Sequence, residues 1–574
     1  MKAIADNDGT AFDTTKDTSG LGGHPRGLTT LFFTELWERF SYYGMRAILV
    51  LFMVAKVEEG GLGFDVKTAA SIYGTYTMAV YILALPGGLI ADKFLGARQT
   101  VLFGGIIIAC GHFSMAFHSM AMFYTGLVLI ALGTGLLKPN ISTMVGSLYS
   151  QKDPRRDGGF SLFYMGINVG AFLAPLVCGT LAEHQSFKSF LSSMNLDPNS
   201  SWHYGFAAAG VGMALGLLQY VLPFSIKISS KITYPLIGGV VGFLVGFLFG
   251  AGKIGSLIGL FLGVLLSFFR EEADERRRWF YIIPGHPLAE VGKPQTKTTE
   301  QQVETVEKKP FNSVFILVYA ILAAITFFVW YRFGKDWVIP VVALDALIVF
   351  ITLGLQEGLT RDEWKRTAAI LILFFFTIFF WAAYEQKGAS LNLFAKNLVN
   401  TQIFGWQFPA SWLQSLTPLY VIMLAPIFSV LWMRLGDKQP SSPAKFALGL
   451  LFIGLAYTLF VPACVLTAQG KVSPLWLVGL YFLEVVGEMC LSPVGLSTVT
   501  KLSPVKFVGL MMGAWFFATS LGNKLAGFIA GFYDPNNSNT LVKMYGGIAV
   551  GLLVSTAVLF LLLPTIRKLI GNEK

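Results

Sequence analysis

The chain has 574 residues, of which 54% are apolar and only 13% are charged, and its mean hydropathy is +0.61. Soluble domains carry about 25% charged residues, so this composition excludes a soluble catalytic protein and indicates a polytopic membrane protein. The net charge of +10 does not indicate nucleic-acid binding. Lys and Arg gather in alternate loops between apolar runs, which is the positive-inside pattern of membrane proteins.

The first 27 residues are polar and lack the apolar core of a signal peptide, so they predict a disordered cytoplasmic tail. Apolar runs long enough to cross a bilayer as helices follow near residues 28–55, 68–91, 98–118, 121–147, 159–182 and 203–226. These runs predict an N-terminal six-helix bundle over residues 28–226.

Residues 227–366 form a less regular insert, with apolar stretches on both sides of a polar segment at 270–310. It predicts additional transmembrane hairpins and a polar cytoplasmic linker. Six further runs lie near residues 367–389, 412–435, 444–467, 474–500, 506–532 and 543–569. They predict a C-terminal six-helix bundle over 367–569 and a short cytoplasmic tail over 570–574. Two such halves suggest a substrate site at their interface, near the membrane midplane.

The first span contains four ionisable residues, Glu35, Glu38, Arg39 and Arg46. With Tyr42 and Tyr43 they recur at helical spacing, so they share one face. One charge at the bilayer centre costs about 2.5–3.5 kcal/mol. Several on one face therefore predict a wet cavity in which charges of opposite sign pair.

The turn after the second span contains Asp92 and Arg98 with a Gly-xxx-Asp-Lys-xx-Gly-x-Arg spacing. This spacing matches the loop signature of the major facilitator superfamily. We interpret the two residues as a cytoplasmic gating pair that breaks when the halves move; an ordinary charged loop is the alternative.

The fourth span carries Lys138 beside Pro139, well inside the apolar run. A buried ammonium requires an anion from the protein or the substrate, unless the side chain snorkels to the interface. In the fifth span, Asn168 is either a binding residue or a polar contact between helices.

The second half contains carboxylates in its spans, at Glu385 in the seventh and at Glu484 and Glu488 in the tenth. A membrane carboxylate that switches between a paired and a protonated state is a proton carrier. The sequence therefore predicts a bipolar cavity, with cations from the first half facing anions from the second. A structural salt-bridge network between the halves is the alternative reading.

Other functional classes find little support. Cys110, Cys178, Cys464 and Cys490 lie in or beside apolar spans without metal-ligand spacing, and the six histidines form no zinc motif, so no metal site is expected. The spans contain no nucleophile arrangement, which disfavours a membrane-embedded enzyme. Trp406 and Trp412 fall in a predicted outer loop and are interpreted as interface anchors.

The charged motifs resemble those of the proton-dependent oligopeptide transporter family of the major facilitator superfamily. The resemblance rests on Glu-xx-Glu-Arg-Phe-x-Tyr-Tyr-Gly from Glu35, Lys-Pro-Asn from Lys138, Phe-Trp-Ala-x-x-Glu-Gln ending at Gln386, and Glu-Met-x-x-Ser-Pro-Val-Gly-Leu from Glu488. It covers both halves and implies a major facilitator fold with two additional helices between them. The implied total is 14 helices, whereas the apolar stretches allow up to 16.

The resemblance also implies residue roles. Proton coupling falls to Glu35, Glu38, Arg39 and Glu385, and the peptide carboxylate to Arg39, Arg46 and Lys138. Glu488 with Asn168 holds the peptide ammonium, and Glu385 pairs with Lys138 or Arg46. Tyr43, Tyr81, Trp381 and Trp515 line side-chain pockets. In the eighth span the family's usual Asn-Pro is replaced by Thr417-Pro418, which puts that ammonium contact in doubt.

Together these features predict a proton-coupled symporter that imports di- and tripeptides by alternating access. A transporter of another small anion or zwitterion, such as nitrate, an amino-acid derivative or a drug, is the alternative on the same fold. Protons serve as the coupling ion and no cofactor is expected. The expected partners are peptides and the lipid bilayer, in a bacterial inner membrane with both termini cytoplasmic. The oligomeric state is left open, with a monomer favoured.

Overall fold

The structure is a computed structural model. It describes residues 17–150, 153–222, 358–403, 405–504 and 508–571, two short strands in the N-terminal tail, and scattered positions between 321 and 355. The additional hairpins predicted for the insert, and with them the choice between 14 and 16 helices, lie outside the described residues.

The described part of the first half is mainly helical. After β1 (Ile4–Ala5), β2 (Ala11–Phe12) and η1 (Leu21–Gly23), its long helices are α1 (Arg26–Val54), α2 (Val66–Ile82), α3 (Ala84–Ile90) with the π-helical turn η3 (Ala91–Leu95), α4 (Gly96–Met115), α5 (Met120–Ser147), α6 (Arg156–Glu183) and α8 (Ser201–Val221). Short elements in the loops are η2 (Val57–Glu59), α7 (Gln185–Ser193) and η4 (Pro198–Ser200). Long apolar runs favour helices here because a helix satisfies its own backbone groups without water.

The second half repeats this pattern. Its long helices are α13 (Arg361–Tyr384), α15 (Leu416–Leu435), α16 (Ser442–Leu466), α17 (Leu475–Leu502), α18 (Val508–Ala530) and α19 (Ser538–Ile570). Between them lie η6 (Glu385–Gly388), α14 (Ser390–Leu398), β3 (Gln402–Ile403), β4 (Trp406–Gln407), η7 (Ala410–Ser415), η8 (Gly436–Lys438) and η9 (Thr467–Gln469). Thr360 begins α13 with a capping box, in which its hydroxyl and Glu363 bond reciprocally.

The seventh span differs from its prediction. A continuous helix was expected over 367–389, but α13 ends at Tyr384 and the chain continues as the 3-10 turn η6. Glu385 is the first residue of this turn. Glu385 therefore lies where the regular α-helix stops. The residues of η6 do not follow the α-helical spacing, so their side chains can point into the space between the halves.

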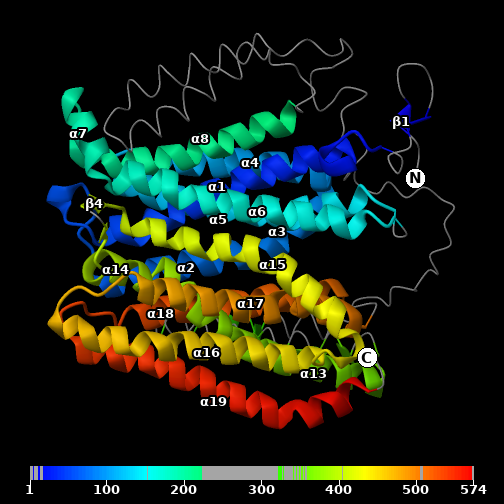
Figure 1. The fold of residues 1–574 in the computed structure, drawn as a ribbon. Helices are drawn as coiled ribbons and strands as arrows, with labels where there is room; N and C mark the ends of the chain where they lie inside the picture. Colours follow the sequence, from blue (N-terminus) through cyan, green and yellow to red (C-terminus); the bar gives the residue numbers. More distant parts are fainter. Residues whose placement is uncertain are drawn as a thin grey trace.

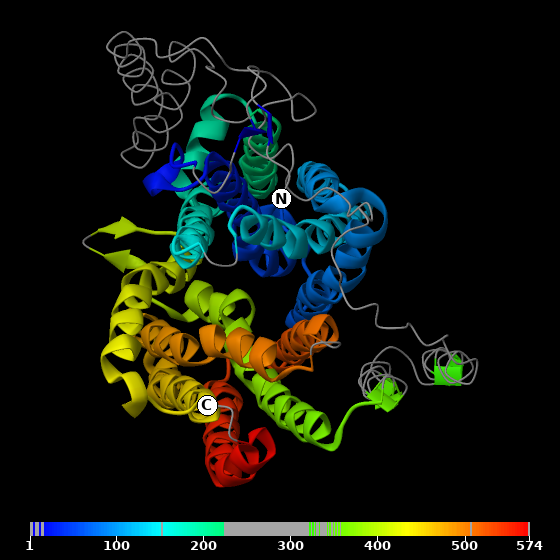
Figure 2. The same ribbon diagram turned by 90° about the vertical axis from the view of Figure 1, so that its right-hand side faces the viewer.

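Nine helices in the described part of the chain are long and apolar enough to cross a membrane. Three further long helices, α1, α4 and α18, complete the two groups of six. Helix α1 is less apolar because of its charged residues, yet the structure buries Glu35, Glu38, Arg39 and Arg46. In Figure 1 the helices of each half run roughly parallel, with the first half above and the second below, and Figure 2 shows the same two groups end-on.

The two halves approach each other most closely through α2 and α18, and also through α6 and α15. Gly74 of α2 faces Gly527 of α18, and a Cβ added to Gly74 would lie 2.9 Å from the Cα of Gly527. Small residues at this crossing let the two backbones touch, as they do at many membrane-helix contacts.

Hydrogen bonds between the halves gather at one end of the molecule. Asn392 donates to the carbonyl of Ala47 at 2.7 Å, and the Lys396 ammonium pairs with Glu183 at 2.8 Å. Trp412 donates to Thr180 at 3.1 Å at the same end. This end carries α7 and β4, and both chain termini lie at the opposite end (Figure 1).

Candidate functional site

The charged face of α1 holds a three-residue cluster. The Nε atom of Arg39 lies 2.6 Å from Glu35 and 2.8 Å from Glu38, one helical turn and one residue away. The hydrogen bond goes to Glu35, while Glu38 is an ion-pair neighbour without a hydrogen bond. Glu38 is fully buried. One guanidinium here faces two carboxylates, so these three residues carry one excess negative charge, which one added proton would neutralise.

About two helical turns further along α1, the side chain of Arg46 reaches from the first half to the second. Its Nη2 pairs with Glu385, and its Nε donates a hydrogen bond of 2.6 Å to the hydroxyl of Tyr73 on α2. Of the two partners implied for Glu385, the structure shows Arg46. This ion pair directly joins α1 to η6.

Lys138 on α5 remains inside the helix bundle. Its ammonium lies 3.7 Å from the ring centre of Tyr81, a cation–π contact, and its electrostatic neighbours include Glu38 and Glu35. It makes no salt bridge with any residue that the structure describes. This position favours a buried cation over a snorkelling lysine, and leaves its charge available to a substrate anion.

The second half supplies the opposite pole. Glu488 on α17 accepts a hydrogen bond from the hydroxyl of Tyr384, the last residue of α13. The ammonium of Lys387 on η6 lies 2.9 Å from the centre of the Tyr384 ring. Residues from α13, η6 and α17 therefore meet at this pole, and one of these residues, Lys387, is a cation.

A cavity of about 140 Å³ lies between the two halves. The predicted site residues that line it are Tyr43, Arg46, Tyr81, Asn168, Trp381, Glu385, Thr417 and Glu488. The cavity thus brings Arg46 of the first half together with Glu385 and Glu488 of the second, while Arg39 and Lys138, the other predicted cations, are not among its lining residues.

Three polar atoms that line this cavity lack hydrogen-bond partners among the described residues. They are the indole nitrogen of Trp381, the hydroxyl of Thr417 and the ammonium of Lys387. Asn168 also lines the cavity, and its amide donates to the Tyr164 carbonyl of its own helix at 2.9 Å, a bond that does not use its side-chain oxygen. A buried polar group without a partner costs about 1–3 kcal/mol, so these groups favour a polar ligand.

One predicted site residue lies elsewhere in the structure. Trp515 does not line this cavity; its ring packs edge-on against Phe374 and Phe446 in the core of the second half. Of the predicted gating pair, Asp92 is exposed and Arg98 is half-buried. Gating by this pair stays a prediction, since a latch closes in only one of the conformations that a transporter visits.

The sequence-based selection omitted residues that the structure places at the site. Lys387, Tyr384, Tyr164 and Gln414 all line the cavity. Lys387 carries a signal that could have found it, because an ammonium two residues after Glu385 in an apolar span is as costly as Lys138. The tyrosines and Gln414 carry no such signal, because aromatic residues are frequent in membrane proteins and an uncharged amide near the start of a span costs less than a charge.

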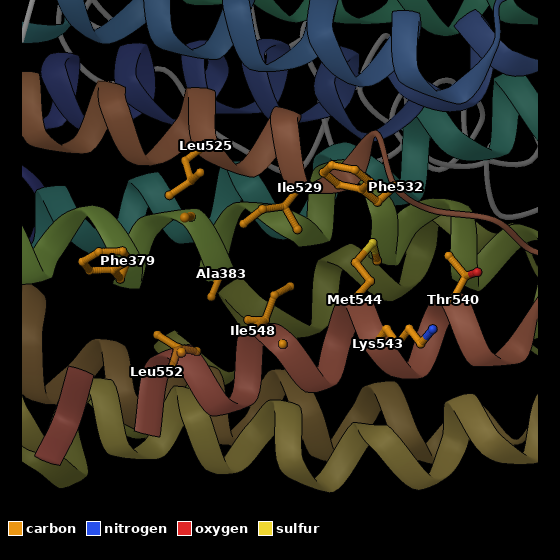
Figure 3. Close-up of a pocket in the computed structure, with 13 residues that line it drawn as sticks. Phe379, Ala383, Leu525, Ile529, Phe532, Thr540, Lys543, Met544, Ile548 and Leu552 are labelled. Carbon is orange, nitrogen blue, oxygen red and sulfur yellow. The ribbon is translucent and has the colours of Figure 1, made fainter. Parts of the chain in front are cut away.

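A larger cavity of about 520 Å³ lies on the other side of α13, between α18 and α19. Its lining is almost wholly apolar, with Lys543 and Thr540 at one end (Figure 3). Ala382 and Ala383 face this space, whereas Trp381 and Glu385 face the charged cavity. Helix α13 therefore separates an apolar groove from the charged site, and the chemistry gathers at the smaller cavity.

Comparison with known proteins decides the family. A family model described as "POT family" matches residues 98–248 and 291–546, which is more than half of the chain. The chain belongs to the POT family. This confirms the resemblance to the proton-dependent oligopeptide transporters, and the helical architecture is the expected major facilitator fold of a multi-pass membrane protein.

Relatives of this POT protein align along nearly its whole length. The peptide transporter YePEPT of Yersinia enterocolitica is 37% identical over 566 residues, covering 96% of each chain. A di-/tripeptide transporter of Lactococcus lactis subsp. cremoris is 32% identical, covering 96% of this chain and 98% of its own. Crystal structures titled "peptide transporter POT", with alafosfalin or sulfate, align with a TM-score of 0.70 and 34% identity over 97% of this chain and 99% of theirs.

Proposed function

We propose that this protein imports di- and tripeptides together with protons by alternating access. The observation that carries the proposal is the cavity between the halves, whose lining includes Arg46 of α1 and the carboxylates of Glu385 on η6 and Glu488 on α17. A peptide is a zwitterion with fixed charged ends, so a bipolar cavity holds its backbone while side chains vary. The relatives named as peptide and di-/tripeptide transporters support the same substrate class.

The free charges suggest how a peptide binds. Lys138 makes no salt bridge with a described residue and contacts Tyr81, which lines the cavity, so it is the first ligand for the peptide carboxylate. Arg39 is the second, because protonation of Glu35 or Glu38 would release its guanidinium. At the other end, Glu488 and the side-chain oxygen of Asn168 receive the peptide ammonium, with the Thr417 hydroxyl as an additional acceptor.

The ion pair between Arg46 and Glu385 suggests how the proton is coupled to movement. This pair connects the halves in the middle of the molecule, while the bonds around Glu183 and Asn392 connect them at one end. Protonation of Glu385 would remove the central pair and lower the cost of separating the halves. The positive-inside pattern and the position of the termini suggest the orientation in a cell's inner membrane. The end of the molecule at which Glu183 and Asn392 join the halves faces outward.

The test is uptake by the purified protein in liposomes. Labelled dialanine should accumulate inside when the outside is acidified, and accumulation should stop when a proton ionophore collapses the gradient. Liposomes without protein measure passive entry. If the wild-type protein binds no dialanine and accumulates none under the gradient, the proposal of peptide symport is wrong.

A further inference from the structure

The apolar groove between α13, α18 and α19 lies outside the charged cavity, and the proposed transport leaves it without a task. Its volume of about 520 Å³ falls in the range of about 300–1,000 Å³ that is typical of ligand pockets. Ala382 and Ala383 of α13 line the groove, whereas Trp381 beside them lines the charged cavity. The groove is therefore a second hollow, on the back of the helix that leads to the charged site.

The length of the groove matches one leaflet of a bilayer. Phe379, Leu525 and Leu552 lie at one end of it, and Thr540 and Lys543 lie at the other (Figure 3). Thr540 and Leu552 both belong to α19, and a helix rises about 18 Å between them. The hydrocarbon core of a bilayer is about 30 Å thick, so the groove extends through about half of it.

The polar end of the groove lies near one membrane surface. Helix α19 begins at Ser538, at the end of the molecule where hydrogen bonds join the halves, and the C-terminus lies at the opposite end (Figure 1). Thr540 and Lys543 fall in the first two turns of this helix. Only 28% of the apolar stretch of α19 is buried, and Phe532 and Gly551, which line the groove, are exposed. The groove therefore opens at the periphery of the bundle, where lipid surrounds the protein.

The charge at the polar end is positive. Lys543 is the one charged side chain among the described residues that line the groove. It makes no ion pair with any part of the chain that the structure describes. Asp534, in the loop before α19, accepts a hydrogen bond from the backbone of Asn536 and does not line the groove. A cation above an apolar groove is complementary to an anionic phospholipid, in which a phosphate is joined to acyl chains.

Gly551 deepens the groove. A Cβ added at this position meets no atom within 4 Å, so no neighbouring helix requires a glycine here. Glycine also destabilises the interior of a helix relative to alanine. The missing side chain therefore serves no packing contact in the described structure, and it leaves room in the groove for a ligand.

We propose that this groove binds an acyl chain of an anionic phospholipid, from the leaflet next to the end where the halves are joined, and that Lys543 binds the phosphate. The lysine stem follows the groove wall, and its ammonium reaches the headgroup level. A helix of the insert or of a second copy would pack through the whole thickness of the membrane, whereas the groove extends through about half of it. Its length therefore favours a lipid chain.

The experiment is native mass spectrometry of the full-length protein, purified in detergent and titrated with dioleoyl phosphatidylglycerol or dioleoyl phosphatidylethanolamine. The two lipids have the same chains and differ in net charge. We expect the first phosphatidylglycerol to bind about fivefold more tightly, the effect of about 1 kcal/mol for one basic residue near an anionic headgroup. Equal affinity of the wild-type protein for the two lipids would overturn the assignment of an anionic headgroup.

The headgroup contact is tested by Lys543→Gln, which removes the charge at an exposed position and should abolish the preference for phosphatidylglycerol. Lys471→Gln is the matched control, because Lys471 is an exposed cation in the loop before α17 and does not line the groove. The control should keep the fivefold preference. If Lys543→Gln keeps it too, Lys543 does not bind the phosphate.

The acyl-chain contact is tested by Gly551→Phe, whose ring fills the groove and should weaken binding of the first lipid at least tenfold for both headgroups. Val550→Phe is the matched control on the same helix, because Val550 is 61% exposed and lies outside the groove. If Gly551→Phe does not purify as folded protein, Gly551→Leu fills the groove with a smaller side chain. Wild-type lipid binding by the folded Gly551 variant would show that the chain binds elsewhere.

Other occupants of the groove give different results in the same experiment. If a segment of the insert fills it, Gly551→Phe lowers the thermal midpoint of the lipid-free protein and leaves lipid binding unchanged. If a second copy fills it, Gly551→Phe removes the mass of a dimer that the wild type shows. Either result overturns the lipid site. Lipid binding is measured without peptide or a proton gradient, so this inference and the proposed transport succeed or fail separately.

Discussion

Arg46 on α1 pairs with Glu385 on η6, and this buried ion pair joins the two halves of the molecule across the cavity. Both side chains are almost fully buried, with 5% and 4% of their surface exposed. A pair of this kind contributes less to net stability than its charges suggest, but removing one partner leaves an unbalanced charge and costs about 3–5 kcal/mol. The pair therefore suits a contact that is broken and remade during transport.

The first prediction concerns Glu385→Gln. The amide keeps the size of the side chain but cannot exchange a proton, so Arg46 loses its charge partner and keeps its hydrogen bond to Tyr73. We expect uptake driven by a proton gradient to fall at least tenfold, while exchange of labelled for unlabelled dialanine without a gradient continues. Tyr73→Phe removes one hydrogen bond and no charge, and should lower uptake by a smaller factor. Equal loss of exchange and driven uptake in Glu385→Gln would contradict a coupling role.

The second prediction concerns the cluster around Arg39. Glu35→Gln and Glu38→Gln each remove one of the two carboxylates that share its guanidinium, so the remaining charges balance without a proton. Gradient-driven uptake should be abolished, and dialanine exchange should survive. Glu58→Gln is the matched control, because Glu58 is exposed in a loop outside the site. Loss of exchange together with driven uptake would make the carboxylate structural.

The sequence predicts most of the fold because the length of a bilayer restricts helices to a narrow range of lengths. Helix α5 begins and ends within one residue of the predicted span, and α1 within two. Charge cost also identifies the poles of the site, since Arg46, Lys138, Glu385 and Glu488 are expensive wherever they lie in a membrane.

What the sequence leaves open depends on how helices are rotated and broken. The turn at Glu385 to Gly388 follows no Pro or Gly signal at its start, so the pattern predicts an unbroken helix there. The contact of Tyr384 with Glu488 depends on where α13 stops relative to α17. Trp515 was assigned to the site by resemblance alone, and a periodic pattern gives a helix face without saying which neighbour that face meets.

The third prediction concerns the end of the molecule where the halves are bonded. Glu183 is nearly fully buried, pairs with Lys396 at 2.8 Å, and accepts a hydrogen bond of 3.3 Å from the backbone of Ser411. Glu183→Gln weakens the pair, and because Lys396 is half exposed we expect a modest shift, about threefold, toward conformations opened at this end. Spin labels at Ser189→Cys and Gln402→Cys measure the separation of the halves there. An unchanged distance distribution would show that the ion pair does not hold this end.

The fourth prediction tests the crossing of α2 and α18. Gly74→Ala places a methyl group 2.9 Å from the backbone of Gly527, which neither helix can accept without moving apart. Overpacking of this kind typically costs about 1–3 kcal/mol, so the thermal midpoint and dialanine uptake should both fall. Gly547→Ala in α19 is the control, because an added Cβ there meets nothing within 4 Å and alanine favours a helix over glycine. If Gly74→Ala is as stable and active as this control, the two halves do not depend on the close approach of α2 and α18 at Gly74 and Gly527.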